Sequence, residues 1–421
     1  MEFVRASIED SAFDTTSWFA LSKIKTDTKS NNVFVFLVDD KYLRSENLLD
    51  ENNDTNYGYI LPRKYLAQII SNIDNLTEEF DQENQPFALF LDYDISYLSD
   101  PYNKVAMQDD LEFLEVLKHD RAYKIYLPIT SNYNFVLHSQ DPKIQKLINT
   151  KKIEFISVGL TTASDNISRR YYSYEMYKDE HQNSKEYPYV GIKLFHNIDE
   201  KNISKEFSQS GISLIENRII FKDMYMIEDK EYSAWQSNWS KLSVMSANYP
   251  LDTIYEDDLR NAVLMVGAAH SQSNDNFEID AFSRQISGIE MHANALMSLY
   301  YLNGKLKRLP LFYSILIIFI VVAMVEFLII SFRESKFYNT LERKKQNYTN
   351  EFLKDIYTLL IPNDKEDFGE LWLVVFSIAI LFGISYYLLT HGEHYWFNWM
   401  IPAMLSVPYL LFMSFKKMVK K

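Results

Sequence analysis

Three long apolar runs in the last quarter of the chain constrain its fold more than any other feature. They cover residues 310–331, 371–390 and 397–415, and the first contains one charge, Glu326. A helix needs about 20 apolar residues to cross the hydrocarbon core of a bilayer. The runs therefore predict three transmembrane helices that follow a large polar region, residues 1–309.

The distribution of basic residues predicts the orientation of these helices. Lys and Arg are frequent in segment 332–370 and in the tail 416–421, whereas the turn 391–396 has neither. Cytoplasmic loops carry the excess of Lys and Arg. We therefore expect a multi-pass protein of the bacterial inner membrane, with residues 1–309 outside and the C-terminus in the cytoplasm. We also expect an export helix upstream of the printed sequence.

Composition argues against several classes of function. The net charge of −14 argues against a nucleic-acid partner, because binding phosphates requires a basic surface. The absence of cysteine excludes disulfides, thiolate zinc sites and cysteine nucleophiles. No glycine-rich phosphate loop, serine–histidine elbow or zinc signature is present. We therefore predict that the protein is not an enzyme and has no evident cofactor.

The region 1–309 alternates between the patterns of buried strands and amphipathic helices. Apolar runs predict strands at 32–40, 86–101, 121–130, 152–162 and 261–270. Helical spacing of apolar residues predicts helices between several of them, and residues 166–177 are typical of an antiparallel extension. The alternation predicts an α/β fold with a mostly parallel sheet and helices on both faces.

Acidic residues follow two of the predicted strands. They are Asp39, Asp40, Asp92 and Asp94. Ligands of open α/β sheets bind beyond the carboxyl ends of the strands. These carboxylates are therefore candidates either to hold a divalent cation or to cap helices and bind loop amides.

Other residues are candidates for the same edge of the sheet. His270 and Asp275 follow the strand at 261–270. The arginines Arg63, Arg169 and Arg170 are candidates to bind an anionic ligand or to pair with the strand-end acids.

The stretch "SGIEMHANAL", residues 287–296, places a histidine and an asparagine on a helix that leads to the first apolar run. Gly288 and His292 share one face of this helix at a spacing of four residues. We predict that His292 and Asn294 bind neighbouring loops, so that the helix couples the polar region to the membrane rather than forming an active site. Glu326, inside the first run, is either a further coupling residue or a partner of Arg333.

Six motifs in order resemble one known family. They are "VFLVDDKYL", "YILPRKYLAQII", "FALFLDYDISYLSDP", "VGLTTASDNISRRY", "VLMVGAAHSQSNDNFEIDA" and "SGIEMHANAL". Together they resemble the CHASE2 domain, an extracytoplasmic sensory domain of bacterial receptors that three membrane helices usually follow. In the fourth motif, Asp165, Arg169 and Arg170 match an aspartate–glycine–arginine turn, with Asn166 in place of the glycine.

The resemblance implies a sensor that detects a ligand or a state of the envelope. Because no output domain follows the three runs in this sequence, we expect the signal to reach a separate protein partner, and a homo-oligomer is a further expectation. Two alternatives stay open. One is a structural subunit of a membrane or envelope complex that senses nothing. The other is a metal-dependent enzyme that uses the strand-end carboxylates.

Overall fold

The computed structural model divides the chain into two compact units. Residues Ile24–Lys305 form the larger unit, and Met1–Lys23 with Leu306–Lys421 form the smaller one. The structure describes residues 10–17, 19, 31–50, 52, 54–57, 61–78, 80–98, 103–130, 134–162, 167–178, 184–198, 218–221, 224–228, 233–237, 241–273, 275–279, 285–304, 306–335, 339–340, 365–391 and 394–400.

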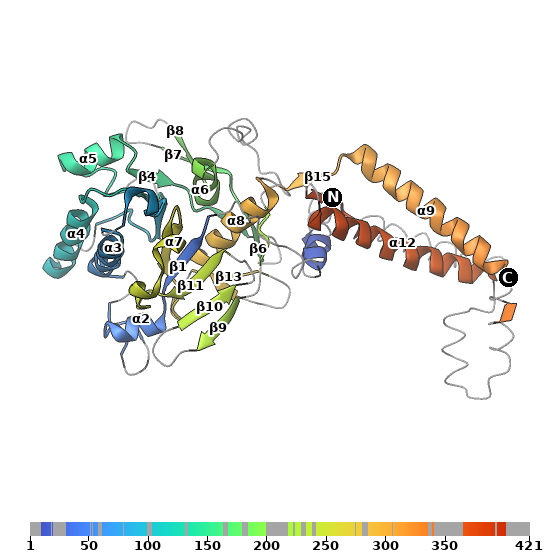
Figure 1. Ribbon diagram of the computed structural model, residues 1–421, viewed down its shortest axis with the longest axis horizontal. Helices are drawn as coiled ribbons and strands as arrows, with labels where there is room; N and C mark the ends of the chain where they lie inside the picture. Colours follow the sequence, from blue (N-terminus) through green and yellow to red (C-terminus); the bar gives the residue numbers. More distant parts are fainter. Residues whose placement is uncertain are drawn as a thin grey trace. The chain divides into compact units, whose positions relative to one another are not determined.

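The larger unit is built on an eight-stranded sheet in the order β4-β3-β2-β12-β1-β11-β10-β9. Figure 1 labels β1, β11, β10 and β9 of this sheet. The strands are β1 (Val33–Val38), β2 (Ala88–Asp92), β3 (Lys124–Pro128), β4 (Ile153–Ile156), β9 (Met224–Glu228), β10 (Ser233–Ser237), β11 (Leu242–Ser246) and β12 (Val263–Ala268). The six strands from β4 to β11 are parallel, and β10 and β9 continue the sheet antiparallel. The predicted α/β fold with a mostly parallel sheet is confirmed.

Short antiparallel pairs accompany this sheet. Strand β5 (Leu160–Thr162) pairs with β6 (Ser168–Tyr171), β7 (Tyr174–Lys178) with β8 (Ser184–Pro188), and β13 (Asn276–Glu278) with β14 (Gln285–Ser287). The antiparallel extension predicted at 166–177 thus belongs to two separate ribbons. Strand β7 has no fully buried residue, so it lacks the apolar face that would seat it in the central sheet.

Helices cover both faces of the central sheet, as Figure 1 shows. They are α2 (Asp40–Ser45), α3 (Arg63–Glu78), α4 (Lys104–Leu117), α5 (Pro142–Asn149), α6 (Val190–Ile198), α7 (Glu256–Leu259) and α8 (Gly288–Leu302). Successive strand side chains point to opposite faces. Leu89 and Leu91 of β2 accordingly join the core formed with α3 and α4, whereas the ring of Phe90 contacts His292 of α8.

Helix α8 is the most deeply buried helix of the larger unit among those that the structure describes. Every residue in it except Glu290 is buried. A capping box begins the helix: the backbone amide and hydroxyl of Ser287 both donate to the Glu290 carboxylate, at 2.8 and 2.7 Å. Asn303 ends it in the left-handed conformation, φ 50°. A helix buried on all sides is a core element.

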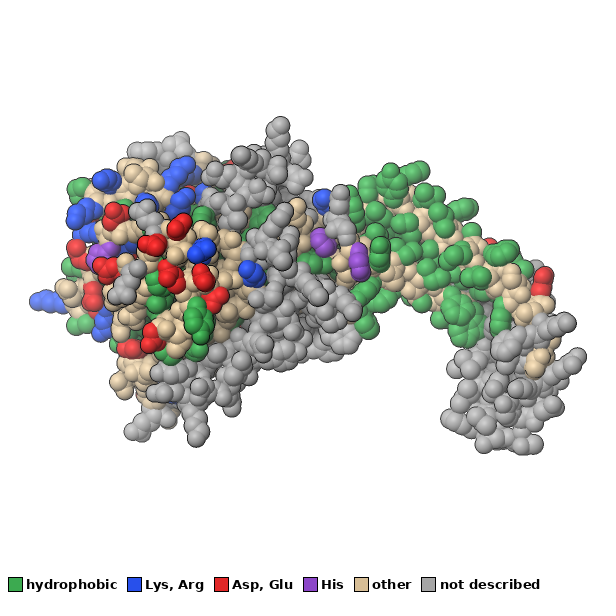
Figure 2. Space-filling model, viewed as in Figure 1, with side chains coloured by type: hydrophobic (Ala, Val, Ile, Leu, Met, Phe, Trp, Pro, Cys, Tyr) green, Lys and Arg blue, Asp and Glu red, His purple; other side chains and the backbone are tan. Residues whose placement is uncertain are grey.

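The smaller unit contains one helix that is long and apolar enough to cross a membrane. Helix α9 (Leu311–Arg333) has a 22-residue apolar stretch, Leu311–Phe332, with a mean hydropathy of 3.1. Exposed apolar side chains cover it (Figure 2). In helix α12 (Lys365–Thr390), the described apolar part is Val374–Thr390. The described residues thus show one candidate span where the sequence predicted three; most of the predicted span 397–415 lies outside them.

Three segments meet beside these helices within the smaller unit. Strand β15 (Lys307–Arg308) pairs with β16 (Tyr395–Trp396). The helical residues 10–17 join them: Trp399 Nε1 donates to Thr16 Oγ1 at 2.9 Å, and the rings of Phe13 and Trp396 are 5.1 Å apart. Residues 10–17 of the region 1–309 therefore pack in the smaller unit.

Candidate functional site

The start of α8 lies directly against the carboxyl ends of two central strands. Gly267 of β12 is in register with Asp92, the last residue of β2. A Cβ atom on Gly267 would lie 2.5 Å from Cβ of Ile289 in α8. A glycine is therefore required here, because only its missing side chain allows the helix to approach the strand this closely.

His292 connects α8 to two other parts of the larger unit. Its Nδ1 lies 2.7 Å from the hydroxyl oxygen of Tyr189, the residue before α6. Its Nε2 lies 3.5 Å from Oδ2 of Asp92. The rings of Phe90 and Tyr189 flank the imidazole, and Tyr171 stacks on Tyr189 with ring centroids 4.4 Å apart. His292 is 2% exposed, so these neighbours define its surroundings.

Asp275 contacts the same helix one turn earlier. Its backbone oxygen accepts a hydrogen bond of 2.8 Å from the Gly288 amide. A Cβ atom on Gly288 would lie 2.2 Å from Oδ2 of Asp275, so the carboxylate occupies the place of a side chain. Because Gly288 and His292 are four residues apart, Asp275 and Asp92 lie along one face of α8. We call Asp92, Tyr189, Asp275 and His292 the strand-end cluster.

Burial dominates the electrostatics of the strand-end cluster. It raises the pKa of Asp275 to about 6 and raises that of Asp92 well above the ordinary value, with the charge of Asp275 adding to the effect on Asp92. It lowers the pKa of His292 to about 3, so the imidazole stays neutral at physiological pH. The Tyr189 hydroxyl is also held protonated, because burial raises its pKa.

A second group of polar side chains lies beside the two acids and has unsatisfied atoms. The hydroxyls of Tyr42, Tyr57 and Tyr93 and the Nδ1 of His270 are buried without a hydrogen-bond partner among the described residues. The pKa of Tyr93 is raised by burial, then by Tyr57, Tyr42, Asp92 and Asp275, so these groups are neighbours. Buried polar atoms are normally satisfied. We call Tyr42, Tyr57 and Tyr93 the tyrosine cluster.

The other strand-end acids have structural partners. Asp39 accepts hydrogen bonds from the Tyr42 amide at 2.8 Å, which caps α2, and from the Ser246 hydroxyl at 2.7 Å. Asp40 accepts from the amide and hydroxyl of Ser271, at 3.0 and 3.1 Å, and so holds the loop after β12.

Asp94 also acts as an acceptor for neighbouring loops. It accepts from the Ser96 amide at 2.9 Å and from the Thr130 hydroxyl at 2.8 Å. Burial alone would raise its pKa, but these hydrogen bonds outweigh burial and lower it. Among the residues that the structure describes, no three His, Cys, Asp or Glu side chains are grouped to hold a metal ion.

The predicted arginines lie at the start of α3 and in β6. Arg63 is buried at the start of α3, where it pairs with Asp110 of α4, donates to the backbone oxygen of Tyr97 and covers the ring of Phe135 at 4.5 Å. Arg170 is buried in β6, where its backbone bridges to Arg218. Arg169 lies in the same strand, and Asp165 is outside the described residues.

The remaining predicted coupling residues lie along α8 and α9. The Asn294 side chain donates to the Glu290 backbone oxygen at 2.9 Å, within α8. One turn later, the Ser298 hydroxyl accepts from the Ile220 amide at 2.8 Å and donates to the Asn294 oxygen at 2.6 Å. Glu326 is exposed on α9, in the smaller unit.

Sequence reasoning missed the tyrosines. Tyr189 stands in "EYPYVGIKLF" and Tyr93 in "FLDYDIS", and neither stretch contains a motif that marks a contact with a distant helix. The signal that could have found Tyr93 is its place directly after the strand-end acid Asp92.

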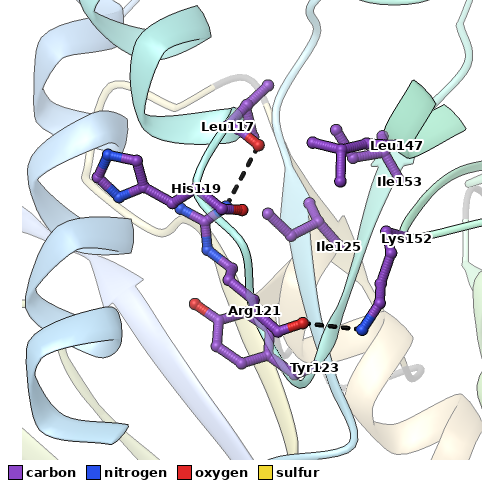
Figure 3. A pocket seen from close by; sticks show the side chains of 8 residues that line it. All are labelled: Leu117, His119, Arg121, Tyr123, Ile125, Leu147, Lys152 and Ile153. Carbon is purple, nitrogen blue, oxygen red and sulfur yellow. Dashed lines mark hydrogen bonds between the residues drawn. The ribbon is translucent and has the colours of Figure 1, made fainter. Parts of the chain in front are cut away.

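A small pocket at the opposite, amino-terminal edge of the sheet is filled by structural contacts (Figure 3). The Arg121 guanidinium forms two hydrogen bonds with Asp74, of 2.7 and 2.6 Å. It also donates to the backbone oxygens of Leu117 and His119, and Lys152 Nζ donates to the Arg121 oxygen at 2.8 Å. These bonds join α3 and the end of α4 to the segment before β3, and that segment to the residue before β4.

The chain matches the family model of the CHASE2 domain over residues 2–327, most of its length. It therefore belongs to the CHASE2 family, whose members are extracytoplasmic sensory domains. The predicted resemblance is confirmed for the domain. No curated protein and no solved structure matches the chain.

Proposed function

We propose that this protein is a membrane-anchored sensor in which the CHASE2 domain binds a small polar ligand beside the strand-end cluster and transmits that binding through α8. The observation that carries this proposal is that α8 contacts the strand-end cluster at its start and leads toward α9 at its end. Its first turns contact Asp275 and Asp92, and only residues 303–310 separate its end from α9. A ligand that changes the position of α8 therefore acts on a helix directly joined to a candidate membrane span.

The tyrosine cluster supports a ligand at this edge of the sheet. Buried hydroxyls without partners cost free energy, on the order of 1–3 kcal/mol each. A ligand with hydrogen-bonding groups would satisfy Tyr42, Tyr57 and Tyr93. The carboxylates of Asp92 and Asp275 favour a ligand that donates hydrogen bonds or carries positive charge, such as a small amine or a hydrated cation.

The output and the topology belong to the same proposal. We propose that the CHASE2 domain lies outside the bacterial inner membrane, because the family is extracytoplasmic and the basic segment 332–370 favours the cytoplasm. The signal would pass to a separate protein through that segment. Ligand binding shifts the population between two arrangements of α8, since it can act only through a difference in affinity for the two.

The proposal is tested on the full chain in lipid nanodiscs by thermal unfolding, followed by intrinsic fluorescence, with Mg²⁺, Ca²⁺, ammonium and putrescine as probes. Binding to the folded state alone raises Tm; at 100 times Kd the gain is about 2.7 kcal/mol. We expect a saturable rise with at least one probe that is lost in Tyr93→Phe. This variant should fold, because it removes a hydroxyl that has no partner.

The matched control is Tyr255→Phe, whose side chain is 77% exposed. Tyr255 stands before α7 and so precedes the start of β12, away from the carboxyl ends of the strands. It should keep the full rise in Tm. If no probe raises Tm, or if Tyr93→Phe retains the whole rise, the ligand does not bind at the tyrosine cluster. The structural-subunit alternative would then be favoured.

A further inference from the structure

We propose that Asp92 and Asp275 together form a proton-binding site, and that gain and loss of this proton move the first turn of α8. This inference rests on the proposed sensor function and names the proton as a stimulus that the same domain detects. A proton needs no cavity. Two buried neighbouring carboxylates favour binding a proton, because burial and mutual repulsion both disfavour their charged forms.

The two carboxylates contact the same helix at positions one turn apart. Asp92 Oδ2 lies 3.5 Å from His292 Nε2, and the Asp275 carboxylate occupies the space beside Gly288. Asp92 ends a central strand, while Asp275 belongs to the loop that follows β12. A change in the interaction between them therefore acts on β2, on this loop and on the start of α8 together.

In the described part of the chain, no cation is placed to balance the pair: no lysine or arginine there forms an ion pair with Asp92 or Asp275. Glu290, in the first turn of α8, is a carboxyl of the same region and accepts hydrogen bonds from the Ser287 amide and hydroxyl. The titratable groups that face the pair include His292 from α8, Tyr189 before α6, Tyr93 after β2, and Tyr42 and Tyr57 from α2 and the loop after it. All are neutral near pH 7, because burial lowers the pKa of His292 and raises the pKa values of the four tyrosines.

Two carboxylates in such surroundings do not both ionise at neutral pH. Each charge is penalised by burial, and the second is also repelled by the first, so the pair retains a proton that isolated carboxylates release. The Asp275 pKa of about 6 places the change in the range that an extracytoplasmic domain meets.

The charge change has a mechanical consequence at α8. The Glu290 carboxylate already supplies the anion that the amide-rich start of α8 favours. When Asp275 ionises as well, its buried charge lies beside Gly288 and close to Asp92, and burial disfavours it there. The close packing of Gly267 on Ile289 leaves no free space for the turn to adjust, so the loop and the turn separate.

The test is hydrogen–deuterium exchange of the full chain in nanodiscs, measured between pH 5 and pH 8 and corrected for the pH dependence of chemical exchange. In the wild type, protection of residues 285–296 should fall as pH rises through about 6. Linkage limits the fall to tenfold per pH unit for each proton. In Asp275→Asn and Asp92→Asn, the protection of residues 285–296 should no longer depend on pH. The control Asp81→Asn, at an exposed position without a side-chain hydrogen bond, should keep the pH dependence of the wild type.

Infrared spectroscopy of the wild type with ¹³C-labelled aspartate provides a readout that needs no folded variant. The proposal expects a protonated carboxyl band at pH 5 that loses intensity by pH 8 as Asp275 ionises. Absence of this band, or an Asp275→Asn exchange profile identical to that of the wild type, would overturn the proton site. A Tyr93-dependent rise in Tm with a pH-independent first turn would overturn the proton site and leave the sensor function standing.

Discussion

Tyr189 and His292 are separated by 103 residues in the chain, yet the Tyr189 hydroxyl oxygen is 2.7 Å from Nδ1 of His292. The other ring nitrogen, Nε2, faces Asp92. The two contacts therefore fix the position of α8 and the orientation of the His292 ring between Tyr189 and Asp92. They join the start of α6, the core helix α8 and the end of β2.

Replacing Tyr189 with phenylalanine should destabilise the larger unit. The substitution keeps the stacking on Tyr171 but leaves Nδ1 of the buried His292 without its partner. We expect a loss of about 1–3 kcal/mol in the free energy of unfolding, measured by urea denaturation. Tyr255→Phe, at an exposed position, should change it by less than about 0.5 kcal/mol. Equal stability of the two variants would mean that the Tyr189 hydroxyl does not support His292.

Replacing Gly288 with alanine should displace Asp275. The new methyl group would lie 2.2 Å from Oδ2 of Asp275, so the loop must move. Overpacking of this kind costs about 1–3 kcal/mol, and the cost should shrink in the double variant Gly288→Ala/Asp275→Ala. Such coupling is measured by a double-mutant cycle. Gly383→Ala, where the methyl group meets no atom within 4 Å, is the matched control. Strictly additive effects would contradict the contact.

Asp275 and His292 should have opposite effects on the pH dependence of stability. Between about pH 6 and 3.8, folded Asp275 holds a proton that the unfolded chain has released. Its contribution to the free energy of unfolding therefore rises as pH falls. Between pH 6.5 and about 3, unfolded His292 binds a proton that the folded chain does not, so its contribution falls as pH falls. Each effect is limited to about 1.4 kcal/mol per pH unit.

Chemical denaturation at pH 4, 5 and 6 separates these two contributions. On acidification, the free energy of unfolding of Asp275→Asn should fall more steeply than that of the wild type. The free energy of unfolding of His292→Asn should fall less steeply than that of the wild type, or rise. The comparison uses slopes rather than absolute values, so the loss of packing in either variant does not obscure it. Slopes that change in the same direction in both variants would contradict the assigned protonation states.

Arg63 should matter for stability and not for ligand binding. Its guanidinium is buried between Asp110 and the ring of Phe135, so Arg63→Met removes the ion pair of a buried carboxylate. Breaking a buried pair costs about 3–5 kcal/mol. Lys118→Met, which breaks more exposed pairs with Glu115 and Asp141, should cost less than about 1 kcal/mol. A probe-dependent rise in Tm that is lost in folded Arg63→Met would restore Arg63 as a ligand residue.

The fold was predictable where strands are long and uniformly apolar. Strands β1, β2, β3 and β12 each lie within such a run, because strands buried on both faces contain few polar residues. Strand β11, "LSVMS", was missed although it lies beside β1 in the sheet. It has five residues with serine at the second and last positions, so its sequence does not differ from that of a loop.

The site was only partly predictable, for a similar reason. Asp39 and Asp92 follow equivalent apolar runs, yet Asp39 caps α2 while Asp92 faces His292. Asp92 is still within β2 and shares a face with Phe90, whereas Asp39 lies one residue beyond β1. That difference of one residue is set by the tertiary structure. The partnership of His292 with Tyr189 likewise depends on how distant segments pack.

The most direct test of the central claim is a distance measurement between two spin labels, one on the larger unit and one at the end of α9. The chain has no cysteine, so Glu115→Cys and Glu334→Cys, both at exposed positions, place the labels uniquely. In the sensor proposed here, the distance distribution changes between pH 5 and pH 8, and Asp275→Asn at pH 8 gives the distribution of the wild type at pH 5. Identical distributions in all three samples would contradict transmission from the strand-end cluster to α9.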